Sequence, residues 1–203
     1  MESSGNNIII ELQYFPCVHA MKAMVDSDSV CIEQWEHYCK MSFRNRSIIV
    51  GSNGLIHLSV PLKDGRQQRN RITDVKIDNT VNWQAQHWRS ITSCYARAPF
   101  FDYFEMKFQQ FYQQPYEYLF DFNMAILKTL LSVFKSSATL NLSESFNPNV
   151  ADLTDMRNVY LPKNYNTNIN NSISYTQVFE DKNGFVPNLS VIDYICCEGV
   201  RLS

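Results

Sequence analysis

Two arginines, Arg44 and Arg46, flank Asn45 shortly before an apolar run that begins at Ile48. Side chains two residues apart on a strand emerge on the same face, so both guanidinium groups would lie side by side if the strand starts this early. Two forked donors in that arrangement suit a phosphate or a carboxylate. The alternative is a solvated strand edge that carries surface arginines, and the sequence leaves both open.

His87 is the candidate general acid or base. It lies one helical turn from Trp83 and one from Ile91, so the three residues share a helix face. An imidazole on such a face can act as a general base when burial tunes its pKa. The alternative, which the apolar surroundings favour, is a core histidine that donates to a backbone carbonyl.

A hydroxyl, an amide and a ring alternate at Tyr175, Gln177 and Phe179. On one strand face they would suit sugar recognition by hydrogen bonding and stacking, and the alternative is a half-exposed strand edge. Asp193 follows Ser190 by three residues in a variant of the capping box. Its carboxylate is therefore predicted to satisfy a backbone N–H first and to bind a ligand second.

The sequence carries no recognisable cofactor or metal motif. It has no GxGxxG, Walker A or HExxH pattern, so its cofactor, if it has one, is unknown. Its six cysteines form no CxxC pair and are predicted to be reduced, mostly buried apolar side chains. The spacing of Cys17, His19, His37 and Cys39 does not match that of a zinc site, so we expect no metal.

Length and composition are those of one domain. The chain has 203 residues, 45% of them hydrophobic, and a formal charge of −2. This balance argues against a nucleic-acid partner but does not exclude a local basic pocket. The candidate residues above suit a small anionic or sugar ligand, and a homo-oligomer is left open. No apolar run approaches the ~20 residues of a membrane span, and no basic segment typical of a secretory signal opens the sequence. The predicted location is cytoplasmic.

The elements that must position these residues begin with a βαβ unit. A strand at 8–12, a helix at 18–25 and a strand at 29–32 predict a partly parallel sheet. Gln13 and Tyr14 would lie in the loop that follows the first strand, where α/β folds bind ligands. The Arg44 to Arg46 segment, the His87 helix and the Tyr175 strand are expected to converge on this loop.

The rest of the pattern completes a single α/β domain over 1–203, with a mixed, largely parallel sheet and helices on its faces. A hairpin is predicted from strands at 47–50 and 56–61, and a last helix begins at 190 and ends at Gly199. Further strands are predicted at 75–77 and 175–179, and further helices at 83–95, 99–111 and 116–135. An asparagine-rich excursion with little regular structure is expected at about 141–174.

The chain resembles the WbqC-like family of bacterial proteins. The matching N-terminal and central motifs are Gln13-x-Phe15-Pro16, Arg44-Asn45-Arg46, Leu58-Ser59-Val60-Pro61 and Trp83-x-x-x-His87-x-x-x-Ile91-x-x-x-Tyr95-x-x-x-Pro99-Phe100. The C-terminal motifs are Tyr175-x-Gln177-x-Phe179 and Phe185-x-Pro187-x-Leu189-Ser190-x-Ile192-Asp193. The sequence departs from the family pattern at Cys17, where members carry an aromatic residue, and at 136–174, which is shortened and lacks glycine.

The resemblance implies a place in the synthesis of O-antigen-type surface polysaccharide. The first hypothesis is a transferase, of acyl or aminoacyl type, that modifies a sugar or a nucleotide-activated sugar, with His87 as its acid or base. The implied substrate-binding residues are Gln13, Tyr14, Arg44, Asn45, Arg46, Tyr175, Gln177 and Asp193. The second hypothesis is a non-catalytic ligand-binding or assembly protein of the same pathway.

Overall fold

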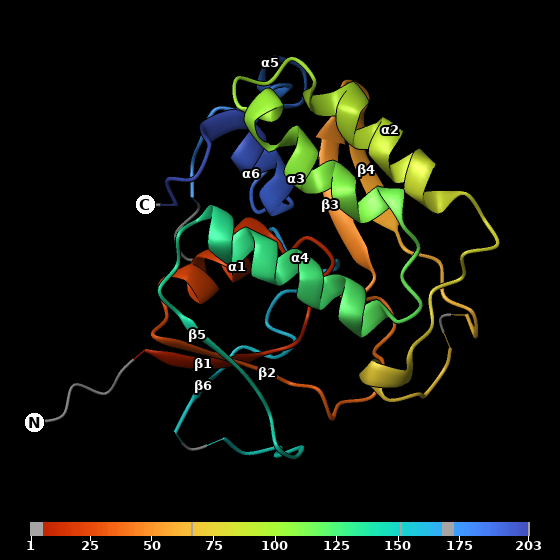
Figure 1. The fold of residues 1–203 in the computed structure, drawn as a ribbon. Helices are drawn as coiled ribbons and strands as arrows, with labels where there is room; N and C mark the ends of the chain where they lie inside the picture. The colour runs from red at the N-terminus through yellow and green to blue at the C-terminus, as the bar shows by residue number, and fades with distance from the viewer. Residues whose placement is uncertain (1–5, 66, 151, 168–172, 203) are drawn as a thin grey trace, which may run out of the picture.

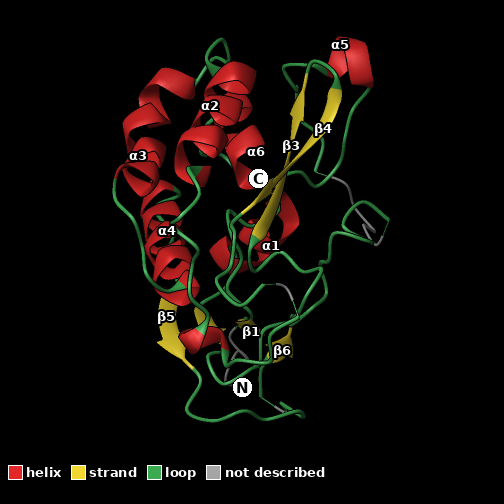
Figure 2. Cartoon of the chain, turned by 90° about the vertical axis from the view of Figure 1, so that its right-hand side faces the viewer, coloured by secondary structure: helices red, strands yellow, loops and turns green. Residues whose placement is uncertain are grey.

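The computed structural model describes residues 6–65, 67–150, 152–167 and 173–202. Within them the chain forms one α/β domain with a parallel sheet at one end and a β-hairpin at the other (Figure 1). Figure 2 shows the larger helices α2, α3 and α4 stacked along one side of the molecule, opposite the hairpin. The predicted fold class, a largely parallel sheet with packed helices, is confirmed.

The first sheet has four parallel strands in the order β5-β2-β1-β6. β1 (Asn7–Ile10) pairs with β2 (Ser29–Ile32), and helix α1 (Val18–Val25) connects them, so the predicted βαβ unit is confirmed. β5 (Thr139–Leu142) and β6 (Thr154–Asp155) occupy the two edges. The isoleucines of β1 are buried, which agrees with a central strand covered on both faces.

The second sheet is the predicted hairpin. β3 (Arg46–Gly51) pairs antiparallel with β4 (Gly54–Ser59). Gly54 has a φ of 108°, a backbone conformation that residues with a side chain rarely adopt, which lets the chain reverse in a tight turn. β3 is buried along almost its whole length, whereas in β4 exposed residues alternate with residues that are partly buried or, at Leu58, fully buried.

The predicted helices after α1 form, α2 with the predicted ends and the others with ends shifted by up to three residues. They are α2 (Trp83–Tyr95), α3 (Phe101–Gln113), α4 (Leu119–Val133) and α6 (Val191–Glu198), together with the short α5 (Glu180–Asn183) and the 3-10 turn η1 (Ile72–Asp74). α6 begins after Ser190, whose Oγ accepts from the Ile192 N–H at 3.3 Å, and ends at Gly199 as predicted.

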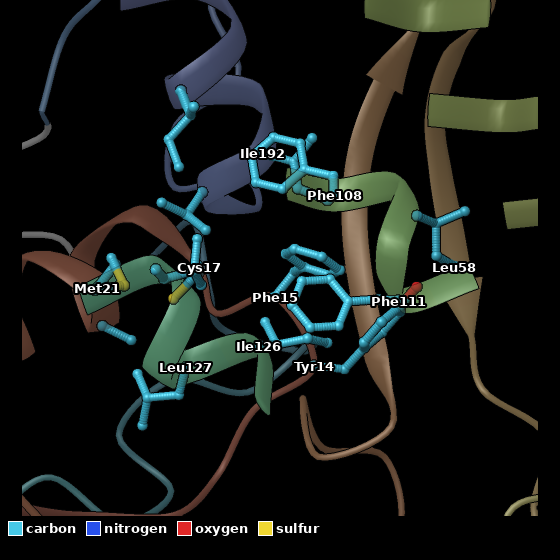
Figure 3. Packing of buried hydrophobic residues seen from close by; sticks show 14 of the residues in the cluster. Tyr14, Phe15, Cys17, Met21, Leu58, Phe108, Phe111, Ile126, Leu127 and Ile192 are labelled. Carbon is cyan, nitrogen blue, oxygen red and sulfur yellow. The ribbon is translucent and has the colours of Figure 1, made fainter. Parts of the chain in front are cut away.

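Within the core, α3, α4 and the loop after β1 bring aromatic rings together among aliphatic side chains (Figure 3). Phe15 packs edge-on against Phe108 and Phe111, at centroid distances of 5.7 and 6.0 Å. Edge-to-face contacts of this kind add to the free energy gained by burying the rings. The Tyr14 and Phe122 rings stack, with their centroids 5.5 Å apart. Stacking of this kind likewise adds to the packing of the core. The loop after β1 is therefore fixed in the interior by its own side chains.

Three parts of the chain differ from the prediction. The segment at 75–77 makes single bridges to Leu62 and Tyr118 and does not form a strand. The segment at 175–179 is irregular because the side chains of Tyr175 and Gln177 hydrogen-bond Asp193. The asparagine-rich excursion supplies the end of β5 and all of β6, while residues 151 and 168–172 of it lie outside the described residues.

Candidate ligand-binding site

Buried acidic and amide side chains gather at the carboxyl ends of the parallel strands. Glu11 and Gln13 follow β1, Glu33 follows β2, and all three are at most 4% exposed. The Gln13 Nε2 donates to Glu11 Oε1 at 2.8 Å. Ser143, which follows β5, donates from its Oγ to Glu33 Oε1 at 2.8 Å. The carboxyl ends of parallel strands meet at one edge, so residues distant in sequence assemble there.

Arg44 is fully buried above this edge and is held by acceptors of the protein itself. Its Nε donates to Glu36 Oε1 at 2.6 Å, its Nη2 donates to Glu36 Oε2, and its Nη1 donates to Asn158 Oδ1 at 3.0 Å. Burial raises the pKa of Glu36, while the Arg44 guanidinium opposes that rise. The prediction that both arginines lie on one strand face is wrong. β3 starts only at Arg46, and the side chain of Arg44 turns inward before the strand begins.

A second buried ion pair joins the segment after β6 to the same edge. The Arg157 Nη1 lies 3.1 Å from Glu33 Oε2, with these side chains 8% and 0% exposed. The neighbouring Asn158 N–H donates to Glu11 Oε2 at 2.8 Å. Sequence reasoning missed Arg157 and Asn158, because the two-residue strand that precedes them gives no hydrophobic pattern.

Two buried amide oxygens in this cluster have no hydrogen-bond partner among the described residues, Gln13 Oε1 and Asn123 Oδ1. The Asn123 Nδ2 donates to the backbone oxygen of Arg44 at 2.7 Å, so this amide also fixes the loop that carries Arg44. A buried acceptor without a donor costs free energy. The cluster therefore combines satisfied ion pairs with two acceptors that could take a further donor.

A cavity of about 350 Å³ lies nearby, between the segment that leads to Arg44 and the loop at 63–71. Its lining residues are Tyr38, Cys39, Lys40, Gln67, Gln68 and Arg69. The Tyr38 hydroxyl donates to Asn45 Oδ1 at 3.0 Å, and Asn45 Nδ2 donates to the Val60 oxygen at 2.9 Å. The predicted residue Asn45 therefore orients the tyrosine of this cavity.

Arg46 contributes positive charge beside the cavity. Burial raises the pKa of Tyr38, and the nearby charge of Arg46 acts against that rise. The Arg46 Nη1 donates to the Met41 sulfur at 3.5 Å, and within the described part of the chain neither Arg46, Lys40 nor Arg69 forms a salt bridge. Unpaired cations around a concave surface attract an anion.

His87 lies inside the aromatic core. Its Nδ1 is 2.9 Å from the Tyr14 hydroxyl, which is itself 2.7 Å from the Tyr112 hydroxyl. Burial lowers the pKa of His87 to about 4, and a hydrogen bond with the Ser59 backbone opposes that shift only in part. The imidazole is thus neutral at pH 7 and enclosed by rings. This geometry agrees with the core-histidine alternative, and a catalytic role for His87 stays a prediction.

Tyr175, Gln177 and Asp193 form a second buried cluster. Asp193 accepts from the Tyr95 hydroxyl at 2.7 Å, from the Tyr175 hydroxyl at 2.6 Å and from Gln177 Nε2 at 3.3 Å. The capping interpretation of Asp193 is wrong, because its carboxylate faces these side chains, while Ser190 caps α6. The Gln177 Oε1 accepts from the Val186 N–H at 2.8 Å, so this amide also serves the fold.

The predicted site residues thus fall into two groups. Gln13, Tyr14, Arg44, Asn45 and Arg46 lie in or beside the region between the sheet edge and the cavity, and His87 joins them through Tyr14. The three residues around Asp193 lie apart and reach α2 through Tyr95 instead. None of the predicted site residues lines the Tyr38 cavity itself, so the expected convergence of the segments on one pocket is not seen there.

The sequence pattern of the WbqC-like protein family matches residues 13–167. The chain belongs to this family. The match includes the Arg44 to Arg46 segment and His87 and ends before Tyr175. An uncharacterized protein of Mycobacterium tuberculosis, Rv1507c, is 29% identical over 93 residues, which are 46% of this chain and 40% of that relative. The chain thus matches less than half of the relative's length, and no solved structure matches it.

Two further observations concern the described residues alone. No group of three or more histidine, cysteine, aspartate or glutamate side chains is arranged there to hold a metal ion. No helix in the same residues combines the length and apolar character needed to cross a membrane.

Proposed function

We propose that the protein binds a phosphorylated or nucleotide-activated sugar, with the anionic group in the cavity beside Tyr38. The observation that carries the proposal is the set of unpaired cations there, Lys40, Arg46 and Arg69, in a chain whose formal charge is −2. A local cluster of positive charge in a chain with a net negative charge favours a ligand that carries at least one negative group. Because the chain belongs to the WbqC-like family, we further propose that this binding serves surface-polysaccharide synthesis.

The neighbourhood of the cavity is suited to binding because its supports are rigid. The buried Arg44–Glu36 pair fixes the segment that carries Tyr38, and Asn45 sets the direction of the Tyr38 hydroxyl. Side chains locked in place before binding lose little conformational entropy when the ligand arrives. The amides of Gln67 and Gln68 line the same space and offer donors and acceptors to sugar hydroxyls.

A transferase that modifies the bound sugar is the second candidate. The observation in its favour is the buried polar cluster at the carboxyl edge of a parallel sheet, where α/β folds place their active sites. A mechanism with His87 as the base is disfavoured, because Tyr14 and Trp83 enclose the imidazole and the pKa of His87 is about 4. Binding without chemistry on His87 therefore has the better support.

Calorimetric titration with sugar 1-phosphates and nucleoside diphosphate sugars tests the binding. We expect at least one of these ligands to bind and its affinity to fall about a hundredfold or more in Arg46→Ala combined with Arg69→Ala, since each of the two charge-assisted hydrogen bonds contributes about 1.5–3 kcal/mol. The matched control is Arg97→Ala, an exposed arginine outside this cavity. Binding that survives in the double variant, or that falls equally in the control, would contradict the proposal.

A further inference from the structure

A second cavity, of about 360 Å³, lies where the start of α2 faces the end of α3. Five amide side chains line it: Asn82, Gln84, Gln109, Gln113 and Gln114. The two helices run side by side in both views of the fold (Figures 1 and 2). None of the residues that line the Tyr38 cavity takes part here, so the two cavities are separate.

The lining contains no aspartate, glutamate, lysine or arginine. Among these amides, only Gln84 makes a side-chain hydrogen bond within the described part of the chain, from its Nε2 to Asn79 Oδ1 at 3.1 Å. Each amide carries both donors and an acceptor, and a sugar hydroxyl is likewise donor and acceptor. A set of neutral, two-way hydrogen-bonding groups fits an uncharged polyhydroxyl ligand, whereas a phosphate would meet no compensating charge.

An indole forms the apolar wall of this cavity. Trp88 lines it, and the centroid of its ring lies 6.1 Å from that of Phe101 and 5.8 Å from that of Tyr112. A fixed aromatic surface packs well against the C–H face of a pyranose ring. Because its neighbours already hold the indole, little conformational entropy is lost when a ligand binds.

The floor of the cavity is anchored to the loop after β1. Tyr112 lines the cavity, and its hydroxyl is 2.7 Å from the Tyr14 hydroxyl, which is in turn 2.9 Å from His87 Nδ1. Buried polar groups linked in this way rigidify the residues that carry them. This gives Tyr14 and His87 a positioning role at the base of the cavity without contact with a ligand.

We propose that this amide-lined cavity binds an uncharged saccharide unit. The inference does not rest on the proposed anion site, because the two cavities share no lining residue. Within a protein that also held a phosphorylated sugar, it would give a second place for a neutral glycan residue.

Uncharged sugars as probes test the inference. A panel of neutral hexoses, N-acetylhexosamines and disaccharides is titrated into the full chain, with saturation-transfer NMR and tryptophan fluorescence as readouts. At least one sugar is expected to bind, and its dissociation constant should rise about tenfold when Gln109→Ala and Gln113→Ala are combined, the loss expected for two neutral hydrogen bonds. Gln110→Ala, one residue along α3 and outside the cavity, should leave the affinity unchanged.

The variants also separate the two cavities. Arg46→Ala with Arg69→Ala should leave binding of the neutral sugar intact, so failure at one site does not imply failure at the other. If the double glutamine variant is poorly folded by circular dichroism, Gln114→Ala, an exposed loop residue, replaces it. The inference is overturned if no sugar in the panel binds, or if the cavity variants bind as tightly as the Gln110→Ala control.

Discussion

Asp193 is a single carboxylate whose burial makes the stability of the whole chain depend on pH. Burial raises its pKa from 3.8 to about 6, although three side chains donate hydrogen bonds to it. The folded protein therefore binds this proton more tightly than the unfolded chain does. The free energy of unfolding falls as the pH rises between these two values, by on the order of 3 kcal/mol, and then stays constant.

Asp193→Asn should remove this dependence, because the amide does not titrate. Urea unfolding at pH 4, 5, 6 and 7 measures the difference in free energy of unfolding between the variant and the wild type. As the pH rises to about 6, the variant should gain stability relative to the wild type, and the difference should stay constant at higher pH. The exposed Asp102→Asn should show no such trend. A difference that does not vary with pH would show that Asp193 titrates normally.

His87 acts in the opposite direction. Its pKa is lowered from 6.5 to about 4 by burial, so the folded protein binds this proton less tightly than the unfolded chain does. The free energy of unfolding should fall as the pH drops through this window, again by on the order of 3 kcal/mol. In His87→Gln this acid-induced loss should be reduced, as followed by urea unfolding at pH 7 and pH 4.5.

The control for this prediction is His57→Gln, because His57 is exposed on β4 and should leave the pH dependence unchanged. If His87→Gln loses stability on acidification as steeply as the wild type, the imidazole is not buried in its neutral form. In that case the acid–base hypothesis for His87 would gain support.

At the scale of elements, the sequence predicts those that rest on local patterns. The βαβ unit, the hairpin and the four longer helices follow from hydrophobic periodicity and from turn residues near them in sequence. β6 could not be predicted, because two residues carry no period and its pairing partner in β1 is more than 140 residues away. The irregular segment at 175–179 alternates like a strand, but its polar side chains bind a carboxylate of α6.

The same distinction applies to the candidate site. Gln13, Arg44 and Asn45 were found because they follow or precede clear strands. The inward turn of Arg44 depends on Glu36 and on Asn158, and the second of these is 114 residues away. Likewise, the amides that line the second cavity come from two helices, and only their packing brings them together. Contacts of this kind leave no pattern in a single sequence.

At the scale of the whole molecule, the Arg44–Glu36 pair after β2 is bonded to Asn158 after β6, whose N–H in turn donates to Glu11 after β1. Glu36→Gln leaves a buried guanidinium with a weaker partner, so the free energy of unfolding should fall by about 3–5 kcal/mol. Because a buried ion pair can often be replaced by apolar side chains, Glu36→Leu with Arg44→Met should recover much of this loss.

The control is Glu117→Gln, which breaks the exposed pair with Lys76 and should change stability little. Urea unfolding of these variants gives the comparison, and a cost for Glu36→Gln no greater than for Glu117→Gln would show that this pair does not hold the three segments together.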